Sequence, residues 1–322
     1  MPPWRQTPSI QYLVPAPEPP FTKPHPSPMP VFLAFVLYFV GCMLLSALLL
    51  PWLQPLLHAL FGATPDRALY RFGMLLTFLG LPWLLRWWKL RDKKSLGFAH
   101  PRPWRELTRG LGWGMLILGL ILGVLLMTGV RQPKPGAITL ATVLSALGAG
   151  LVSGLAVGLI EEFFFRGALQ TGMRRSLAFW PTALLIGLFY AVVHFIRPTP
   201  LANGAALNLF SALGMLWGGL GNLAEFADYA DSFVALLLAG MLLSLTRERT
   251  GSFHFATGLH AGWVIMIRIA KRLSETNHDS PWIFLIGDYD NITGWLAAGV
   301  IVLFILIYDQ VTRSKPLRST TH

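Results

Sequence analysis

Charged residues are scarce in this sequence, and their scarcity excludes an ordinary soluble protein. Only 13% of the 322 residues are charged and 54% are hydrophobic, whereas an average soluble domain carries roughly 25% charged residues. Cysteine is scarce as well, because Cys42 is the only one and it lies inside an apolar run. An intramolecular disulfide and a thiolate metal cluster are therefore both excluded.

The first 30 residues lack an apolar stretch long enough for the core of a signal peptide. They hold 11 of the 24 prolines instead, so we expect residues 1–30 to be a disordered, uncleaved cytoplasmic tail. Residues 313–322 carry Arg313, Lys315 and Arg318 and are expected to form a short basic tail. The chain between them, residues 31–312, is predicted to be a single transmembrane domain.

Long apolar runs make up most of that domain. Residues 31–50 contain no charge over 20 residues, which matches the roughly 20 helical residues needed to cross about 30 Å of hydrocarbon. Seven more runs lie at 68–85, 110–130, 138–160, 177–195, 232–246, 252–267 and 293–308. The sequence therefore predicts an all-α fold, a polytopic transmembrane helix bundle of about eight spans.

A ninth apolar run, residues 201–221, differs from the others because it contains five glycines together with Asn203 and Asn208. Lys and Arg concentrate in cytoplasmic loops. With a cytoplasmic amino terminus, 18 of the 26 Lys and Arg residues lie inside if this run does not cross the membrane. Only 16 lie inside if the run does cross. We therefore expect an interfacial or re-entrant element that lines a cavity, with both termini cytoplasmic in the plasma (inner) membrane.

The formal net charge of +11 is interpreted as a signal of topology. A nucleic-acid-binding protein gathers its basic residues on one solvated face, whereas here they lie between apolar runs. The segment 86–109 alone holds eight Lys or Arg residues and should face the cytoplasm. The lipid bilayer is thus an expected partner, and nucleic acid is not.

The fourth apolar run ends in the sequence EEFFFRG, residues 161–167. Charges at membrane depth cost about 2.5–3.5 kcal/mol each on insertion scales, so they indicate a functional site. Glu162 and Arg166 are four residues apart and lie on one face of a helix, where they can pair. Glu161 is rotated by about 100° from Glu162, so one carboxylate is left over. The structural alternative is a cluster at the membrane edge that is solvated by headgroups.

Three histidines lie in later apolar runs. His194 follows an uncharged segment and could equally be an interhelical hydrogen-bond partner. His254 and His260 are six residues apart, about 240° around a helix, so they do not form the metal pair of an HExxH motif. His260, flanked by small residues, is the better site candidate, and His254 is expected to be structural.

One free carboxylate and two histidines from three helices suit the activation of water. An apolar environment makes a carboxylate a stronger base, and imidazoles can orient water or stabilise an oxyanion. The same three residues, Glu161, His194 and His260, also fit a zinc site with an open position. Spacing alone does not separate these mechanisms.

These segments resemble a known family. EEFFFRG at Glu161, YAVVH at His194 and RTGSFHFATGLHAGW leading to His260 are similar to the three motifs of the CPBP (CAAX protease and bacteriocin-processing, Abi) intramembrane proteases, which include the type II CAAX prenyl endopeptidases. The resemblance covers about residues 138–270. It implies that Glu161 activates water, His194 holds that water and His260 stabilises the oxyanion, with Glu162 and Arg166 as a structural ion pair.

Two positions depart from the motifs. The second motif usually has phenylalanine four residues before its histidine, where this chain has Tyr190, and the third has asparagine or aspartate four residues after its histidine, where this chain has Val264. Valine donates no hydrogen bond, and the loss of one oxyanion donor costs about 10²–10³ in rate. Asn203 or Asn208 would replace it if the run 201–221 folded over the site.

The sequence thus favours an intramembrane endopeptidase that cleaves a membrane-embedded or lipid-linked peptide. No cofactor is favoured, and zinc held by Glu161, His194 and His260 is the alternative. A catalytically weak or inactive membrane scaffold or regulator of the same fold is the second hypothesis, with Val264 in its favour. A transporter is the third, because of the intramembrane charges and the interrupted run 201–221.

Overall fold

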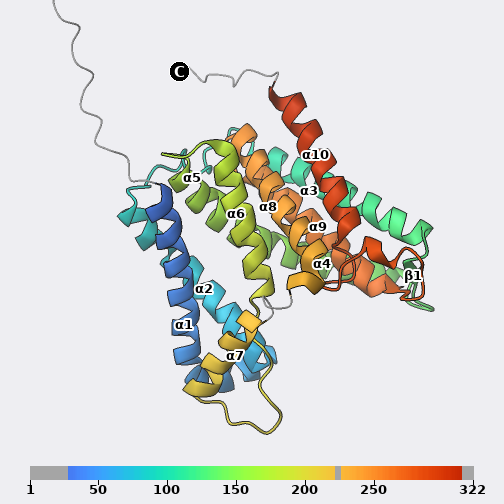
Figure 1. Ribbon diagram of the computed structural model, residues 1–322, viewed down its shortest axis with the longest axis horizontal. Coiled ribbons are helices and arrows are strands. Elements are labelled where there is room, and N and C mark those ends of the chain that lie inside the picture. The colour runs from blue at the N-terminus through green and yellow to red at the C-terminus, as the bar shows by residue number, and fades with distance from the viewer. Residues whose placement is uncertain (1–27, 222–225, 314–322) are drawn as a thin grey trace, which may run out of the picture.

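The computed structural model describes residues 28–221 and 226–313, and almost all regular structure in them is helical (Figure 1). The α-helices are α1 (Pro28–Phe61), α2 (Pro65–Trp87), α3 (Pro103–Met127), α4 (Leu140–Glu162), α5 (Gln170–Met173), α6 (Phe179–Phe195), α7 (Leu209–Gly221), α8 (Ala230–Thr250), α9 (His254–Leu273) and α10 (Trp295–Arg313). A π-helix, η1 (Phe163–Leu169), joins α4 to α5, and two 3₁₀ turns are η2 (Phe226–Tyr229) and η3 (Ile283–Leu285). Most of the two predicted tails, residues 1–27 and 314–322, lies outside the described residues.

Local sequence signals set several helix ends. Pro65 and Pro103 open α2 and α3, where the missing N–H of proline costs nothing. The side chain of Thr139 accepts a hydrogen bond from the Thr142 amide and so caps α4. Gly251 ends α8 with a left-handed φ of 67°, a backbone conformation that favours glycine.

The predicted fold class, a polytopic helical bundle, is confirmed. Each of the eight predicted apolar runs lies within or largely within one of the long helices. Six helices are long and apolar enough to cross a membrane, namely α1, α2, α3, α4 with its continuation through Met173, α8 and α10. The 17-residue helix α6 is shorter, and α9 ends in a basic turn with Lys271 and Arg272. The total of eight spans stays a prediction.

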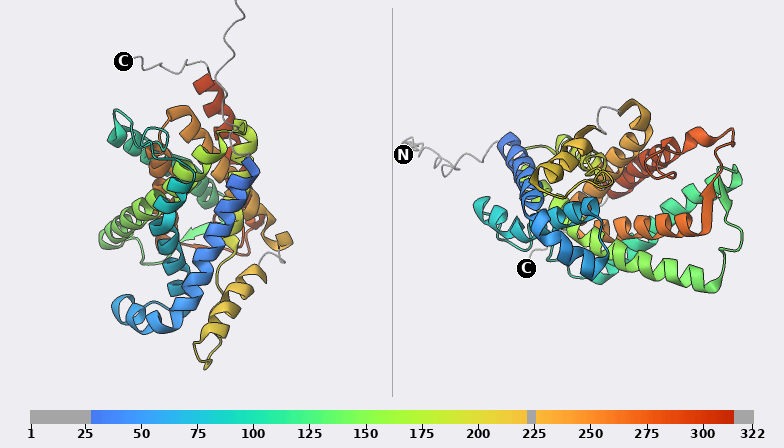
Figure 2. Two further views of the ribbon diagram at one scale, coloured as in Figure 1. Left: turned by 90° about the vertical axis from the view of Figure 1, so that its left-hand side faces the viewer. Right: turned by 90° about the horizontal axis from the view of Figure 1, so that it is seen from below.

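The first residues of α1 and the last residues of α10 lie at the same end of the molecule, at the top in Figure 1. The right-hand view of Figure 2 shows α1 toward one end of the molecule and the far ends of α3, α4 and α9 toward the other. An even number of crossings brings the two ends of a chain to one side. The arrangement is therefore compatible with the predicted eight spans.

The run 201–221 forms a helix only from Leu209 onward. At 13 residues, α7 is about 20 Å long, too short to cross about 30 Å of hydrocarbon. It packs against α1, and its start is capped by Asn208, whose Oδ1 accepts a hydrogen bond from the Ser211 amide at 3.0 Å. Asn203 and Asn208 are both exposed.

Helix α9 lies very close to α3, and glycines on both helices make this approach sterically possible. Gly110 and Gly114 on α3 face Gly258 and Gly262 on α9. A Cβ atom on Gly114 would lie 2.2 Å from the carbonyl oxygen of Leu259, a distance that real Cβ atoms do not show. Small residues with this spacing let membrane helices pack backbone to backbone.

The opposite face of α9 meets α4 in a similar way. Gly150, Gly154 and Gly158 on α4 are four residues apart and all face α9. A Cβ atom on Gly154 would lie 2.8 Å from the carbonyl oxygen of Ala261. Helix α9 is therefore held between α3 and α4, and its histidine His260 is brought against the end of α4.

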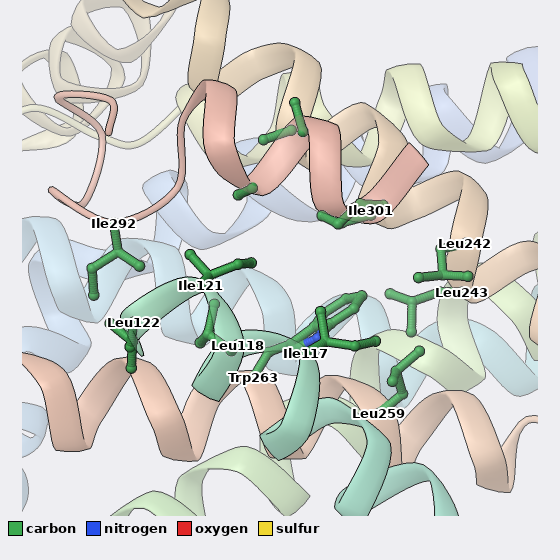
Figure 3. Close-up of a cluster of buried hydrophobic side chains, with 14 of the residues drawn as sticks. Ile117, Leu118, Ile121, Leu122, Leu242, Leu243, Leu259, Trp263, Ile292 and Ile301 are labelled. Carbon is green, nitrogen blue, oxygen red and sulfur yellow. The ribbon is translucent and has the colours of Figure 1, made fainter. Parts of the chain in front are cut away.

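A hydrophobic cluster fills the space between α3, α8, α9 and α10. Figure 3 shows Ile117 and Leu118 of α3, Leu242 of α8, Trp263 of α9 and Ile301 of α10 around one apolar centre. All five are less than 10% exposed. This cluster fixes the side of α9 that α4 does not cover.

A two-stranded antiparallel sheet joins the far ends of α3 and α9. Strand β1 (Arg131–Pro133) pairs with β2 (Ser274–Thr276). Arg131 is 3% exposed, and its guanidinium donates hydrogen bonds to the carbonyl oxygens of Ala270 and Ser274 at 3.1 and 2.7 Å. The buried arginine thereby ties the loop after α3 to the end of α9.

The substitution Gly114→Ala tests the close packing of α3 on α9. The new methyl group meets backbone, which cannot move aside as a side chain can, so we expect a loss of about 1–3 kcal/mol in the free energy of unfolding. Thermal unfolding in detergent measures it. Gly112→Ala is the matched control on the same helix, because no described atom lies within 4 Å of its Cβ position. Equal melting temperatures for both variants would contradict the packing argument.

Candidate active site

The two glutamates of the EEFFFRG segment lie at the point where α4 changes into a π-helix. Glu161 and Glu162 are the last residues of α4, and Arg166 lies in η1. The spacing of Glu162 and Arg166 predicts a regular α-helix here, and the wider turn of the π-helix differs from it. Short π-helical segments inserted in α-helices are frequent at functional sites.

The predicted pair of Glu162 and Arg166 is present. Arg166 Nη1 donates to Glu162 Oε1 at 3.1 Å, and both side chains are 0% exposed. Arg166 Nη2 also donates to the carbonyl oxygen of Gly240 on α8 at 2.8 Å. The rings of Phe165 and Tyr190 lie 5.4 and 5.2 Å from the guanidinium carbon, within the range of a cation–π interaction. The structural alternative, a cluster at the membrane edge that is solvated by headgroups, is therefore wrong for this pair.

His260 joins the same chain of hydrogen bonds. Its Nδ1 lies 2.9 Å from Glu162 Oε1, and because a carboxylate oxygen only accepts, Nδ1–H is the donor. Glu162 Oε1 thus accepts from Arg166 and from His260 together. The remaining ring nitrogen, His260 Nε2, points toward Glu161 and lies 4.0 Å from its Oε2 atom, beyond direct hydrogen-bond distance.

Glu161 is the carboxylate that the sequence left without a partner, and the structure places it accordingly. Its side chain is 13% exposed and lines a cavity. Its Oε2 atom is buried and has no hydrogen-bond partner among the described residues. A buried carboxylate oxygen normally has a partner, so this oxygen is placed to bind a water molecule or a substrate group.

His194 comes from α6 and reaches the same cavity. Its Nδ1 lies 2.7 Å from the carbonyl oxygen of Tyr190, which can only accept, so Nδ1 carries the hydrogen. In the neutral ring Nε2 then has a free lone pair. His254, in contrast, begins α9 beside Ser252, with its Nδ1 2.6 Å from the hydroxyl oxygen, and lies outside the described cavity lining. This placement agrees with the predicted structural role of His254.

The cavity has a volume of about 330 Å³. Glu161, His194 and His260 line it from α4, α6 and α9, so the structure brings all three predicted residues to one space. Its apolar wall is formed by part of the cluster in Figure 3, including Ile117 and Trp263. The three polar side chains therefore face a cavity whose remaining wall is largely apolar.

Asn203 and Asn208 do not reach this cavity. The described lining residues include neither asparagine, whereas Val264 is one of them. The suggestion that the run 201–221 folds over the site and replaces the missing donor is therefore wrong. The asparagines stay away from the cavity because α7 packs against α1, which holds the run 201–221 away from α9.

Several lining residues were missed by the sequence analysis. Arg197 lies two residues after the end of α6. It donates a hydrogen bond to the hydroxyl of Tyr289, and its guanidinium carbon lies 4.8 Å from that ring. Burial raises the pKa of Tyr289 to about 12, so its hydroxyl stays protonated. A charge three residues after His194 was a signal for Arg197. No feature of the sequence pointed to Tyr289 or Tyr70, which come from distant parts of the chain.

The zinc alternative uses the same three side chains, Glu161, His194 and His260. Within residues 28–221 and 226–313, no group of three or more His, Cys, Asp or Glu side chains is placed so that it could hold a metal ion. His194 Nδ1 and His260 Nδ1 are engaged by a carbonyl and by Glu162, so each has only Nε2 for a ligand.

The fold and these residues define a class, a polytopic helical membrane protein with a buried carboxylate–histidine site. Residues 143–266 match the family model of the type II CAAX prenyl endopeptidase Rce1-like proteins. This match confirms the resemblance that the three motifs indicated, and it implies a membrane-bound protease. No curated protein and no solved structure matches the chain significantly.

Replacing Glu162 with Gln tests the buried ion pair. Glutamine keeps an oxygen acceptor but removes the charge that compensates Arg166, and breaking a buried pair costs about 3–5 kcal/mol. The melting temperature in detergent and the abundance in membranes should both fall. Glu248→Gln is the matched control because its pair with Arg174 is about one-third exposed, where a pair contributes about 0.2–1 kcal/mol. If both variants lose the same stability, Glu162 does not hold the buried arginine.

Proposed function

We propose that this protein is an intramembrane endopeptidase in which Glu161 is the general base. The observation that supports this most directly is the unpartnered Oε2 atom of Glu161, 4.0 Å from His260 Nε2 in a largely apolar cavity. A water molecule at about 2.8 Å from both atoms fits this separation. Glu161 takes a proton from that water, whose oxygen attacks the carbonyl carbon of the substrate peptide bond.

The two histidines assist at different atoms. His194 Nε2, with its lone pair free, accepts a hydrogen bond from the attacking water and so orients it. His260 is fixed by Glu162 through Nδ1, and it donates from Nε2 to the oxyanion when the ring is protonated. Glu161 then returns the proton to the leaving amine. The ion pair of Glu162 and Arg166 positions His260 and does not itself react.

A second cavity supports a membrane-embedded or lipid-linked peptide as the substrate. It has a volume of about 680 Å³ and is bounded mainly by apolar residues of α1, α6 and α7, including Phe39, Val193 and Trp217. Tyr70 lines both this cavity and the one that holds Glu161. A substrate with a long hydrocarbon group would place that group in the apolar cavity and its peptide bond at Glu161.

A catalytically weak or inactive scaffold of the same fold is the competing function. Its support is Val264, which lines the cavity at a position where the family motif has a hydrogen-bonding side chain. A scaffold predicts that membrane partners bind without being cleaved. The two functions differ in whether loss of the Glu161 carboxylate changes any peptide product.

The substitution Glu161→Gln tests the role of the base. Glutamine keeps the shape of the side chain but accepts no proton, so we expect the rate to fall about 10²–10⁴-fold while the protein stays folded. The rate is measured with a fluorogenic farnesylated CAAX peptide in detergent micelles, per folded molecule. Comparative proteomics of membranes from cells with wild type or Glu161→Ala identifies the cell's own substrates.

Two outcomes would contradict this assignment. Near-normal turnover by Glu161→Gln, together with inactive but stable Glu162→Gln, would reverse the roles of the two carboxylates. Loss of activity on chelation, with recovery on zinc and about one zinc per chain in the purified protein, would replace the glutamate mechanism with a metal mechanism. We propose that activity needs no bound metal and therefore persists in chelator.

We further propose eight spans with both termini cytoplasmic in the plasma (inner) membrane, because this topology places 18 of the 26 Lys and Arg residues inside. A reporter fused after Asp231, at the start of α8, should report the outside. A fusion after Thr250, at the other end of α8, is the matched control and should report the cytoplasm. A cytoplasmic signal at Asp231 would mean that the run 201–221 crosses the membrane.

A further inference from the structure

The hydroxyl of Tyr190 belongs to a buried residue of the cavity wall, and the mechanism above does not use it. Tyr190 is 3% exposed and lines the cavity of Glu161. In the part of the chain that the structure describes, its hydroxyl has no hydrogen-bond partner. A buried tyrosine hydroxyl usually has one. Its partner is thus expected to be a molecule that enters the cavity.

The ring of Tyr190 is held between the two histidines of the site. Its centroid lies 4.3 Å from the ring centroid of His194 and 6.2 Å from that of His260. The guanidinium carbon of Arg166 lies 5.2 Å from the same ring. The ring is thereby fixed by contacts that do not involve the hydroxyl, in a side chain that lines the cavity of Glu161.

Two neighbours in the cavity wall make the role of this hydroxyl specific. Tyr289 makes a ring contact with His194 alone of the two histidines, at 6.4 Å, and its hydroxyl oxygen is held by the hydrogen bond that it accepts from Arg197. Val264, one turn after His260 on α9, lines the cavity with a side chain that donates nothing. Of these three residues, Tyr190 is the one that carries a hydroxyl and has a ring contact with both His194 and His260.

We propose that the Tyr190 hydroxyl donates a hydrogen bond to the oxyanion, beside His260, and so supplies the donor that Val264 lacks. The inference rests on the proposed endopeptidase function. When the water oxygen bonds to the carbonyl carbon, the electron pair of the C=O bond moves to the carbonyl oxygen. The water proton goes to Glu161, and Tyr190 keeps its own proton throughout.

The substitution Tyr190→Phe removes only the hydroxyl. Its ring contacts with His194 and Arg166 remain, so we expect an unchanged melting temperature in detergent. The kcat for the farnesylated CAAX peptide should fall about 10²–10³-fold, which is the effect of losing one oxyanion donor, while KM stays the same. A kcat equal to that of the wild type would overturn the proposal.

Tyr38→Phe is the matched control, since it removes a tyrosine hydroxyl that donates to the carbonyl oxygen of Thr77, outside the lining of both cavities, and it should keep the wild-type kcat per folded molecule. A second measurement uses a phosphinate analogue of the same peptide, which carries negative charge where the oxyanion forms. Tyr190→Phe should weaken phosphinate binding without changing KM, because only the anion needs the donor. Equal phosphinate affinity in both proteins would also overturn the proposal.

Wild type and Glu161→Gln are assayed in parallel to separate the two levels of inference. If wild type cleaves, Glu161→Gln does not and Tyr190→Phe is normal, the endopeptidase stands and the role of Tyr190 is refuted. If wild type cleaves neither the farnesylated CAAX peptide nor any membrane protein that changes in the proteome, the endopeptidase itself is refuted, and the role of Tyr190 with it.

Discussion

The close approach of α9 to α3 and α4 is the constraint on which the rest of this structure depends. In a membrane, burial of apolar surface gives little drive for helices to associate, so close backbone packing has to supply it. The glycines of α3 and α4 remove the side chains that would keep α9 at a distance. Because α9 carries His260 and α4 carries Glu161 and Glu162, the same contact that holds the bundle together also assembles the site.

The buried charges depend on this packing in turn. Arg166 and Glu162 are 0% exposed, and a buried ion pair stabilises a protein only when its other hydrogen-bonding groups are satisfied. The second donor to Glu162 is His260, and the second acceptor for Arg166 is the carbonyl of Gly240. Three helices thus share one chain of hydrogen bonds. The Oε2 atoms of Glu161 and Glu162 both lack a partner among the described residues, but Glu161 lines the cavity whereas Glu162 is held in the ion pair, which gives the two adjacent carboxylates different surroundings.

The two departures from the family motifs have one physical explanation when they are seen in the same cavity. Val264 removes a polar side chain from the wall, and Tyr190 adds a hydroxyl to it. Each substitution looks like a loss or a neutral change when it is considered alone in the sequence. Together they keep a donor near the two histidines, on α6 instead of α9.

The sequence by itself determined the helical membrane fold, because hydrophobic runs of spanning length have few other structures open to them. It also singled out Glu161, His194 and His260, because polar and charged side chains are costly in such runs. Helical spacing then indicated that Glu162 pairs with Arg166. Only the tertiary structure decided that α7 packs on α1 and that the chain turns into a π-helix after Glu162. It alone also placed Arg197, Tyr289 and Tyr190 around one cavity. These depend on contacts between segments far apart in the chain, and neither local periodicity nor composition carries information about such contacts.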